Sequence, residues 1–202
     1  MALAALACGS KPAAPEAWKE AGPPELRLWG FAEDFDRPLA VFQHVFWEPR
    51  DTTTTREMLG ELDLTGKRVL EIGTGSGLLS LCALKAGAAS VVATDINPHA
   101  VENARFNAER FGYAQRFEAR LVPQDDSGAY AVLRPGERFD LILSNPPWED
   151  DTPGKIEDFA LYDLRWALLR SLLDGLAERL EPDGKAWLAY GTRQGVEAVL
   201  RE

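Results

Sequence analysis

Apolar residues along most of the chain alternate between short continuous runs and longer stretches with helical spacing. The short runs have the length expected of buried strands, and they lie at 68–72, 90–94, 139–144 and 186–190. A further strand is predicted at 117–122, where charged residues interrupt the apolar ones. The helical stretches follow them and lie at 78–86, 98–110 and 163–180. Strands that alternate with helices predict a parallel sheet covered on both faces, which is a doubly wound α/β domain.

Composition divides the chain into three segments. Residues 1–24 are rich in Ala, Pro and Gly and are predicted to form a flexible N-terminal arm. Residues 25–64 form an aromatic-rich lead-in that ends in an amphipathic helix, predicted at 56–64. Residues 65–202 carry the α/β pattern and are expected to form the ligand-binding domain. Within them, Pro-Asp-Gly at 182–184 predicts a turn before the last strand.

Charge and rare residues narrow the choice of partners. The chain has 22 Lys and Arg against 32 Asp and Glu, a formal net charge of −10, which disfavours a nucleic-acid partner and leaves a protein substrate as the first expectation. Cys8 and Cys82 form neither a disulfide framework nor a metal-ligand spacing, so we expect no metal and a reducing, cytoplasmic location. No apolar run approaches the ~18 residues of a membrane span. The oligomeric state is left open.

A glycine-rich turn separates the first predicted strand from its helix. Gly73, Gly75 and Gly77 allow backbone to approach a ligand, and the following helix presents free N–H groups to an anionic part of it. A tight turn without a ligand is the plain alternative. A nicotinamide site is the rival ligand site, since Asp95 would suit its ribose too. However, that site needs G-x-G-x-x-G, and here Leu78 occupies the third glycine position.

Val69–Gly77 resembles the first motif of class I S-adenosylmethionine-dependent methyltransferases, and Thr94–Pro98 resembles their second. The resemblance implies S-adenosylmethionine as cofactor and a Rossmann-like sheet. The predicted sheet stops two strands short of the full class I fold, so we expect a version that lacks its last strands. By this resemblance the cofactor-binding residues are expected to be Thr52, Glu71, Gly73, Thr74, Gly75, Gly77, Asp95, Ile96, Asp125 and Asn145. Among these, Asp95 would accept the ribose hydroxyls. Asp125, with the neighbouring Asp126 as the alternative, would accept the adenine amino group.

A second motif, Asn145-Pro146-Pro147-Trp148, ends the fourth predicted strand. Ligands bind beyond the carboxyl ends of parallel strands, so these residues should face the site. The prolines fix the backbone and leave carbonyl groups in set directions. The side-chain oxygen of Asn145 and the Pro146 carbonyl could accept both hydrogens of an –NH2 group, and Trp148 could stack on a flat acceptor. A proline-rich turn with a core tryptophan is the alternative without a catalytic role.

This tetrapeptide resembles the (N/D/S)-P-P-(Y/F/W) signature of enzymes that methylate amide or exocyclic nitrogens. They include the HemK/PrmC-type release-factor glutamine methyltransferases and the adenine N6 and guanine N2 methyltransferases. Residues 45–52 resemble the HemK-type lead-in, and they share features with the Thr-rich lead-in of ribosomal-protein methyltransferases. The chain departs from the glutamine enzymes in having Trp148 where they carry Tyr, and we expect it to be without their helical N-terminal domain.

The sequence therefore predicts an N-methyltransferase that acts on a planar amide or amino nitrogen. A protein glutamine side chain is the first choice of acceptor, and an RNA or DNA base is the second. A small molecule is the third. From a different class, the chain could be a cofactor-binding subunit without activity of its own.

Overall fold

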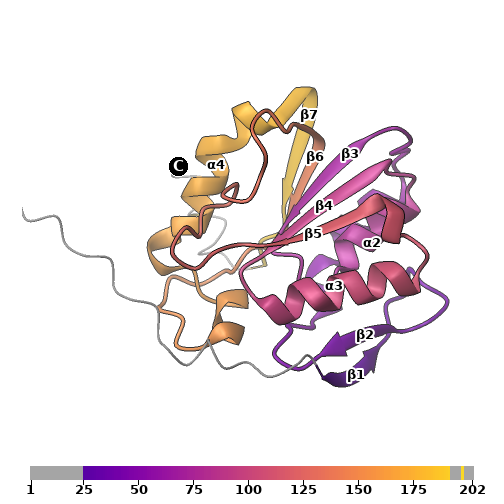
Figure 1. Cartoon of the computed structure of the whole chain (residues 1–202), viewed down its shortest axis with the longest axis horizontal. Coiled ribbons are helices and arrows are strands. Elements are labelled where there is room, and N and C mark those ends of the chain that lie inside the picture. Colours follow the sequence, from indigo (N-terminus) through magenta and orange to yellow (C-terminus); the bar gives the residue numbers. More distant parts are fainter. Residues whose placement is uncertain (1–24, 192–196, 198–202) are drawn as a thin grey trace, which may run out of the picture.

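The computed structural model describes residues 25–191 and residue 197 of the 202-residue chain (Figure 1). The predicted N-terminal arm, residues 1–24, lies outside the described residues. None of the helices in the described part is long and apolar enough to cross a membrane.

A five-stranded parallel sheet organises the chain, with the strand order β5-β4-β3-β6-β7. The strands are β3 (Arg68–Ile72), β4 (Ser90–Asp95), β5 (Phe117–Leu121), β6 (Phe139–Ser144) and β7 (Leu180–Leu188). Because all five run in one direction, their carboxyl ends meet at a single edge of the sheet (Figure 1). The predicted Rossmann-like α/β fold is confirmed. The described residues contain no sixth or seventh strand of this sheet.

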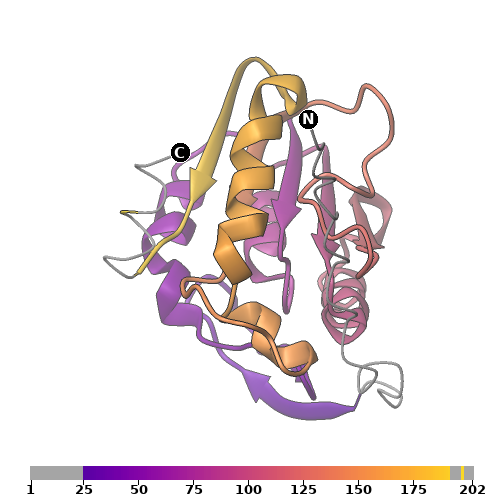
Figure 2. The same cartoon turned by 90° about the vertical axis from the view of Figure 1, so that its left-hand side faces the viewer.

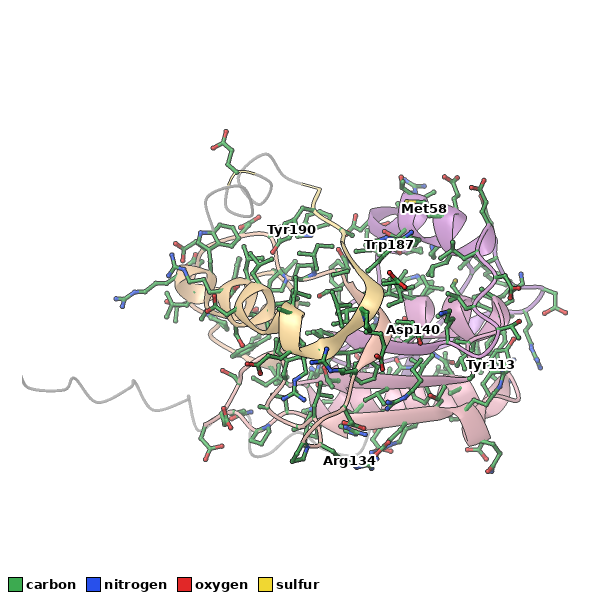
Figure 3. All side chains as sticks on the ribbon, turned by 90° about the horizontal axis from the view of Figure 1, so that it is seen from above. Met58, Tyr113, Arg134, Asp140, Trp187 and Tyr190 are labelled. Atoms are coloured by element: carbon green, nitrogen blue, oxygen red, sulfur yellow. The ribbon has the colours of Figure 1, made fainter. Side chains whose placement is uncertain are left out.

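Helices cover both faces of the sheet. They are α1 (Thr53–Gly60), α2 (Leu78–Lys85), α3 (Pro98–Arg110) and α4 (Ala167–Arg179), with short 3-10 helices η2 (Pro49–Thr52), η3 (Ala114–Arg116), η4 (Ile156–Ala160) and η5 (Leu164–Trp166). Alternate strand residues point to two cores: Val69 packs with leucines of α2, and Leu70 packs with Leu172 of α4. Figure 2 shows α4 crossing the sheet face, and Figure 3 shows Trp187 of β7 toward the side of α1, where Met58 lies.

The aromatic lead-in folds as a hairpin, which the sequence did not predict. Strands β1 (Leu26–Gly30) and β2 (Leu39–Phe42) pair antiparallel, and the first three residues of β2 are fully buried. The hairpin packs on α3 through β2 (Figure 1). Helix α1 occupies 53–60 rather than the predicted 56–64, because the preceding 3-10 helix carries the chain directly into it.

Two predictions near the end of the chain were wrong. Residues 182–184 lie inside β7 rather than in a turn before it. In the pairing of the two strands, Phe139 of β6 is opposite Leu180 and Leu141 is opposite Lys185, so β7 has extra residues between these two pairs. The turn-forming residues are therefore absorbed as a bulge. The helix expected from residue 163 begins at Ala167, since Arg165 and Trp166 both have positive φ angles, 56° and 55°.

Replacing Gly184 by Ala should destabilise the fold at this bulge. A Cβ atom there would lie 2.9 Å from the Phe139 carbonyl oxygen and 3.0 Å from that of Glu181, both on the backbone. We expect the free energy of unfolding to fall by about 1–3 kcal/mol, as in other overpacked sites, which urea denaturation would measure. Gly60→Ala is the matched control: a Cβ at the end of α1 meets nothing within 4 Å, so it should be neutral or stabilising.

Candidate active site

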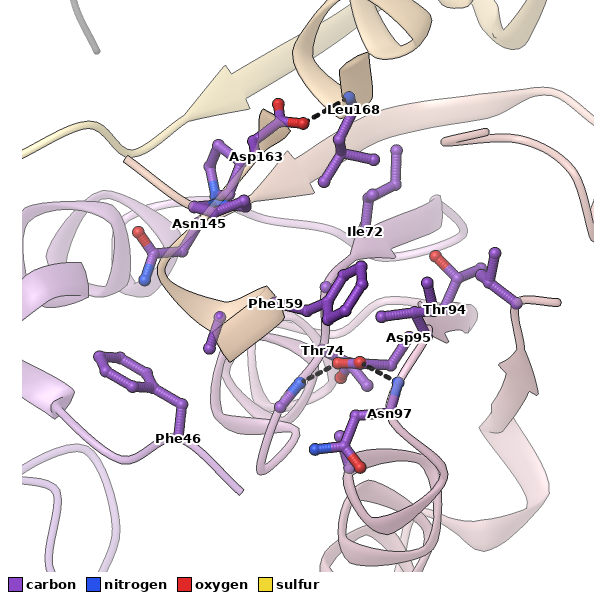
Figure 4. Close-up of a pocket in the computed structure, with 18 of the residues that line it drawn as sticks. Phe46, Ile72, Thr74, Thr94, Asp95, Asn97, Asn145, Phe159, Asp163 and Leu168 are labelled. Atoms are coloured by element: carbon purple, nitrogen blue, oxygen red, sulfur yellow. Dashed lines mark hydrogen bonds between the residues drawn. The ribbon is translucent and has the colours of Figure 1, made fainter. Parts of the chain in front are cut away.

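A cavity of about 590 Å³ opens at the carboxyl ends of β3, β4 and β6, a volume typical of small-molecule sites. Four parts of the chain line it: the lead-in at 46–52, the glycine turn with the end of β4, the segment 122–129, and the residues after β6 up to 168 (Figure 4). The lining residues predicted from the sequence are Thr52, Glu71, Gly73, Thr74, Gly75, Asp95, Ile96, Asn145, Pro146 and Pro147. Their roles stay predictions.

The glycine turn leaves room for a ligand. Gly73 and Gly75 have positive φ angles of 76° and 53°, which side chains rarely tolerate. A Cβ atom added at Gly73 would meet no protein atom within 4 Å, so the space above the turn is open. The backbone N–H groups of Gly73 and Thr74 donate to the Thr94 carbonyl at 2.9 and 3.0 Å, which fixes the turn against β4.

Glu71 fixes the glycine turn through hydrogen bonds of its side chain. Its Oε2 atom accepts hydrogen bonds from Thr74 Oγ1 at 2.8 Å, from the Ser80 N–H at 3.1 Å and from the Ser80 hydroxyl. Burial raises the pKa of its carboxyl group to about 7. This oxygen joins the glycine turn to α2, which makes Glu71 a residue that positions the turn.

Asp95 faces the cavity from the end of β4 (Figure 4). Its Oδ2 accepts the Gly75 N–H at 2.9 Å, and its Oδ1 accepts the Asn97 N–H at 2.8 Å. Each carboxylate oxygen has a second lone pair, so both can still accept a hydroxyl group of a ligand. Burial raises the pKa of Asp95 to about 6. The residue thus suits a ligand with two adjacent hydroxyl groups, such as a ribose.

The lead-in reaches the cavity because Arg56 anchors it. The buried guanidinium donates to the Pro49 carbonyl at 3.1 Å and pairs with Asp34 near the hairpin. Thr52 is buried between these residues and the cavity, and its hydroxyl donates to the same Pro49 carbonyl at 3.3 Å. On the far side of the lead-in, His44 Nδ1 lies 2.5 Å from Glu157 Oε1 on η4, so the lead-in and η4 meet beside the opening.

Two buried asparagines of α3 were missed by the sequence analysis. Asn107 accepts the Ala40 N–H at 2.9 Å and donates to the Ala40 and Ser76 carbonyls, both at 2.9 Å. Asn103 accepts the Phe42 N–H at 2.8 Å and donates to the Ala40 carbonyl at 2.8 Å. A signal was present, since the two asparagines are four residues apart on the apolar face of a helix.

The acceptor end of the cavity begins where β6 ends. The buried Ser144 hydroxyl donates to the Ile72 carbonyl at 2.8 Å, which fixes the end of β6 against β3. Asn145 follows, and its Oδ1 atom is buried without a hydrogen-bond partner among the described residues. A buried acceptor left unpaired costs about 1–3 kcal/mol, so this oxygen is suited to a donor brought by a ligand. Pro146, Pro147 and Phe159 line the cavity with it (Figure 4).

Trp148 does not lie where the stacking role requires. It is not among the residues that line the cavity, and its indole N–H donates to the Ala189 carbonyl at 3.1 Å beyond β7. Its ring contacts the backbone at Gly191, where an added Cβ atom would lie 2.4 Å from the ring. The segment after the two prolines thus directs the ring back toward β7. The aromatic residues that line the cavity are instead Phe46, Trp47, Phe159 and Tyr162.

Two of the expected cofactor residues also lie outside the cavity lining. Gly77 has a φ angle of 83°, and a Cβ atom there would lie 3.1 Å from Ala104, so it is required where α2 approaches α3. Asp125 is exposed and does not line the cavity, whereas the neighbouring Gln124 and Ser127 do. The sequence predicted a cavity residue in this polar loop, but it could not resolve that Gln124 and Ser127, rather than an acid, reach the cavity.

The comparisons with known proteins point to methyltransferases. The family model of the ribosomal protein L11 methyltransferases (PrmA) matches residues 50–146. The ribosomal protein L11 methyltransferase of Deinococcus radiodurans is 43% identical over 97 residues, which make up 46% of this chain and 34% of that protein. The matched segment therefore spans about a third of the length of such curated relatives.

Solved structures agree on the fold. The ribosomal protein L11 methylase of Lactobacillus delbrueckii subsp. bulgaricus has a TM-score of 0.54 and 26% identity, covering 78% of this chain and 69% of that one. A SAM-dependent methyltransferase of Agrobacterium tumefaciens has a TM-score of 0.59 at 22% identity, covering 86% and 55%, and shows the fold alone. The chain carries the S-adenosylmethionine-binding core of a class I methyltransferase. The HemK-type resemblance stays a prediction.

The described residues contain no group of three or more His, Cys, Asp or Glu side chains that could hold a metal ion. The polar groups around the cavity fit S-adenosylmethionine: open space above the glycine turn, and two carboxylate oxygens of Asp95 with free lone pairs.

The affinity for the cofactor product S-adenosylhomocysteine should depend on the ionisation of Asp95. The ionised carboxylate accepts both ribose hydroxyls and the protonated form cannot, so the affinity is retained above the pKa of about 6 and lost below it. We expect the Kd to rise about tenfold from pH 7 to pH 5, as one linked proton requires.

Calorimetric titration of the wild-type chain, Asp95→Asn and Asp125→Asn would check this. Asp95→Asn should bind more weakly and lose most of the pH dependence between pH 5 and pH 7. Asp125→Asn removes an exposed acid outside the cavity and should behave as the wild type. A wild-type Kd that is flat over this range would contradict the assignment.

Proposed function

We propose that this chain transfers the methyl group of S-adenosylmethionine to a nitrogen of a protein substrate, with a glutamine side-chain amide as the acceptor. The observation that carries this proposal is the Asn145 Oδ1 atom, buried and without a partner among the described residues, in the cavity that Asp95 also lines. An –NH2 group would donate one hydrogen to this oxygen and the other to the Pro146 carbonyl.

The shape of this end of the cavity supports a planar acceptor. The two prolines restrict the backbone on one side, and Phe159 from η4 offers an aromatic surface. Phe159 takes the stacking role that the sequence assigned to Trp148. S-adenosylmethionine supplies a methyl group on a good leaving group, so the protein has to hold the nitrogen in line with it. Such orientation can contribute about 7–11 kcal/mol to the lowering of the barrier.

Charge supports a protein rather than a nucleic acid as the substrate. The chain carries a formal charge of −10, and Glu149, Asp150 and Asp151 are exposed directly after the acceptor motif. Such a surface repels a phosphate backbone. The matched family is named for the methylation of a ribosomal protein, which agrees with a protein substrate for this chain.

Labelled S-adenosylmethionine offered with three acceptor sets would test the substrate class. The sets are peptides with an exposed glutamine, the same peptides with the glutamine replaced by lysine, and single-stranded oligonucleotides. We expect label in the glutamine peptides, as an N-methylamide detectable by mass spectrometry. Label in the lysine peptides would keep a protein substrate but replace the amide by an amine. Label in the oligonucleotides alone would overturn the protein assignment.

Asn145→Ala should abolish turnover without loss of the cofactor. We expect kcat to fall by at least about 100-fold, the typical loss when a reacting group is misplaced, while the Kd for S-adenosylhomocysteine changes less than threefold. Thr152→Ala is the matched control, since Thr152 also lines the cavity but is exposed and lies outside the motif. Turnover retained in Asn145→Ala would refute the proposed acceptor site.

A further inference from the structure

Asp163 is a buried carboxylate that neither sequence motif accounts for. It is only 6% exposed, yet it lines the same cavity as Asn145, and Figure 4 draws the two residues away from Asp95. Its backbone N–H donates to the Glu149 carbonyl at 2.8 Å, so it lies against the chain that leaves the acceptor motif. The sequence analysis predicted residue 163 only as the start of a helix.

The turn that holds Asp163 is strained. Arg165 and Trp166 both adopt left-handed backbone conformations, each of which costs a non-glycine residue on the order of 1 kcal/mol. The carboxylate compensates in part, since Oδ1 accepts the Leu168 N–H at 2.9 Å and Oδ2 accepts the Leu169 N–H at 3.0 Å. The Ala167 N–H also bonds to this carboxylate, so three N–H groups at the start of α4 fix it, and a lone pair remains to take up a proton.

The surroundings make Asp163 a stronger base than an exposed aspartate. Burial raises the pKa of its carboxyl group, and the charge of Asp150 raises it further, while the helix N–H groups act in the opposite direction. Burial raises the pKa of the Tyr190 phenol and the nearby charge of Asp163 raises it further. The Tyr190 hydroxyl is buried without a partner among the described residues. Tyr162 also lines this part of the cavity, and Arg165 is exposed.

A nitrogen that gains a methyl group has to lose a proton. The Asn145 oxygen and the Pro146 carbonyl can accept hydrogen bonds from an –NH2 group, but neither takes up a proton near neutral pH. Three other carboxylates line the cavity, and Glu48 of the lead-in is exposed. The two buried ones are committed to the cofactor end: Glu71 holds the glycine turn, and Asp95 holds the Gly75 and Asn97 N–H groups. Asp163 is the buried carboxylate at the acceptor end.

We propose that Asp163 is the catalytic base of this site, an inference that rests on the proposed function. The nitrogen lone pair forms the new N–C bond as the bond between the methyl carbon and sulfur breaks, and that bonding pair stays on sulfur as a neutral thioether. One N–H proton of the acceptor passes to a carboxylate oxygen of Asp163. The neutral acid then returns the proton to solvent as the product leaves.

Asp163→Asn tests this assignment in the full chain. Asn keeps the size and one acceptor oxygen for the helix N–H groups but cannot take the proton. We expect kcat at saturating S-adenosylmethionine to fall by about 100-fold or more, with the acidic limb of the kcat–pH profile lost and the Kd for S-adenosylhomocysteine nearly unchanged. Saturation with cofactor separates this limb from the ionisation of Asp95, which acts on cofactor affinity.

Asp150→Asn is the matched control. Asp150 Oδ1 accepts the Arg165 N–H of the same strained turn at 2.6 Å, but the residue is exposed and lies outside the cavity lining. This variant should keep kcat on the plateau and retain an acidic limb, moved to lower pH because the charge of Asp150 no longer raises the pKa of Asp163. An Asp163→Asn variant that is merely less stable, with wild-type kcat and profile, would show that Asp163 only caps the turn and would overturn the proposal.

Two further outcomes are decisive. If Asp163→Asn does not fold, the dependence of the wild-type kcat on pH becomes the test. A kcat that falls toward acidic pH supports Asp163 as the base, and a kcat that is constant between pH 5 and pH 8 overturns the proposal. If the wild-type chain methylates no acceptor, the proposed function fails and Asp163 loses its role with it. If the wild-type chain is active and Asn145→Ala abolishes this activity while Asp163→Asn does not affect it, the role of Asp163 is refuted and the proposed function stands.

Discussion

The pairing of β2 with the side chains of α3 is the interaction on which the cofactor half of the site depends. Asn103 and Asn107 provide β2 with the hydrogen bonds that a neighbouring strand would otherwise supply, and Asn107 also holds the Ser76 carbonyl of the glycine turn. The groups around Asn107 are buried, so a lost partner there would leave an unpaired group at a cost of about 1–3 kcal/mol. One amide thereby sets the lead-in, α3 and the glycine turn in fixed relative positions.

The two ends of the cavity are built by different means. The cofactor end uses strand ends and a glycine turn, whose backbone N–H groups are fixed against Thr94 and Asp95 within the sheet. The acceptor end instead uses the segment 145–166, which contains short 3-10 helices, an isolated β-bridge and a strained turn before α4. Rigid backbone suits a cofactor of constant shape, while an irregular segment is where substrate preference can differ between relatives of one fold.

The sequence predicted the sheet because most of its strands are short apolar runs between turn signals. It predicted Asp95 and the glycine turn because the spacing of their residues reflects the backbone that they require. It failed where tertiary contacts decide. The β1–β2 hairpin depends on asparagines far away in α3, and the bulge at Gly184 depends on pairing with Phe139. Trp148 was assigned to the site by its neighbours in the chain, although its ring follows β7. Asp163 gave no local signal, since its place in the cavity requires the positive φ angles after it.

The buried carboxylates at the two ends of the cavity have different surroundings. Glu71 and Asp95 lie at the cofactor end, where burial raises the pKa of both, and a ligand that donates hydroxyl groups favours the ionised form of Asp95. Asp163 at the acceptor end meets no such donor from the cofactor, and the N–H groups of α4 alone oppose its burial. The proposed acceptor nitrogen, which loses a proton on methylation, is therefore best placed at this end, where the raised pKa of Asp163 favours uptake of that proton. Burial of these ionised carboxylates lowers the stability of the folded state. It also places Asp163, the proposed proton acceptor, at the other end of the cavity from Asp95.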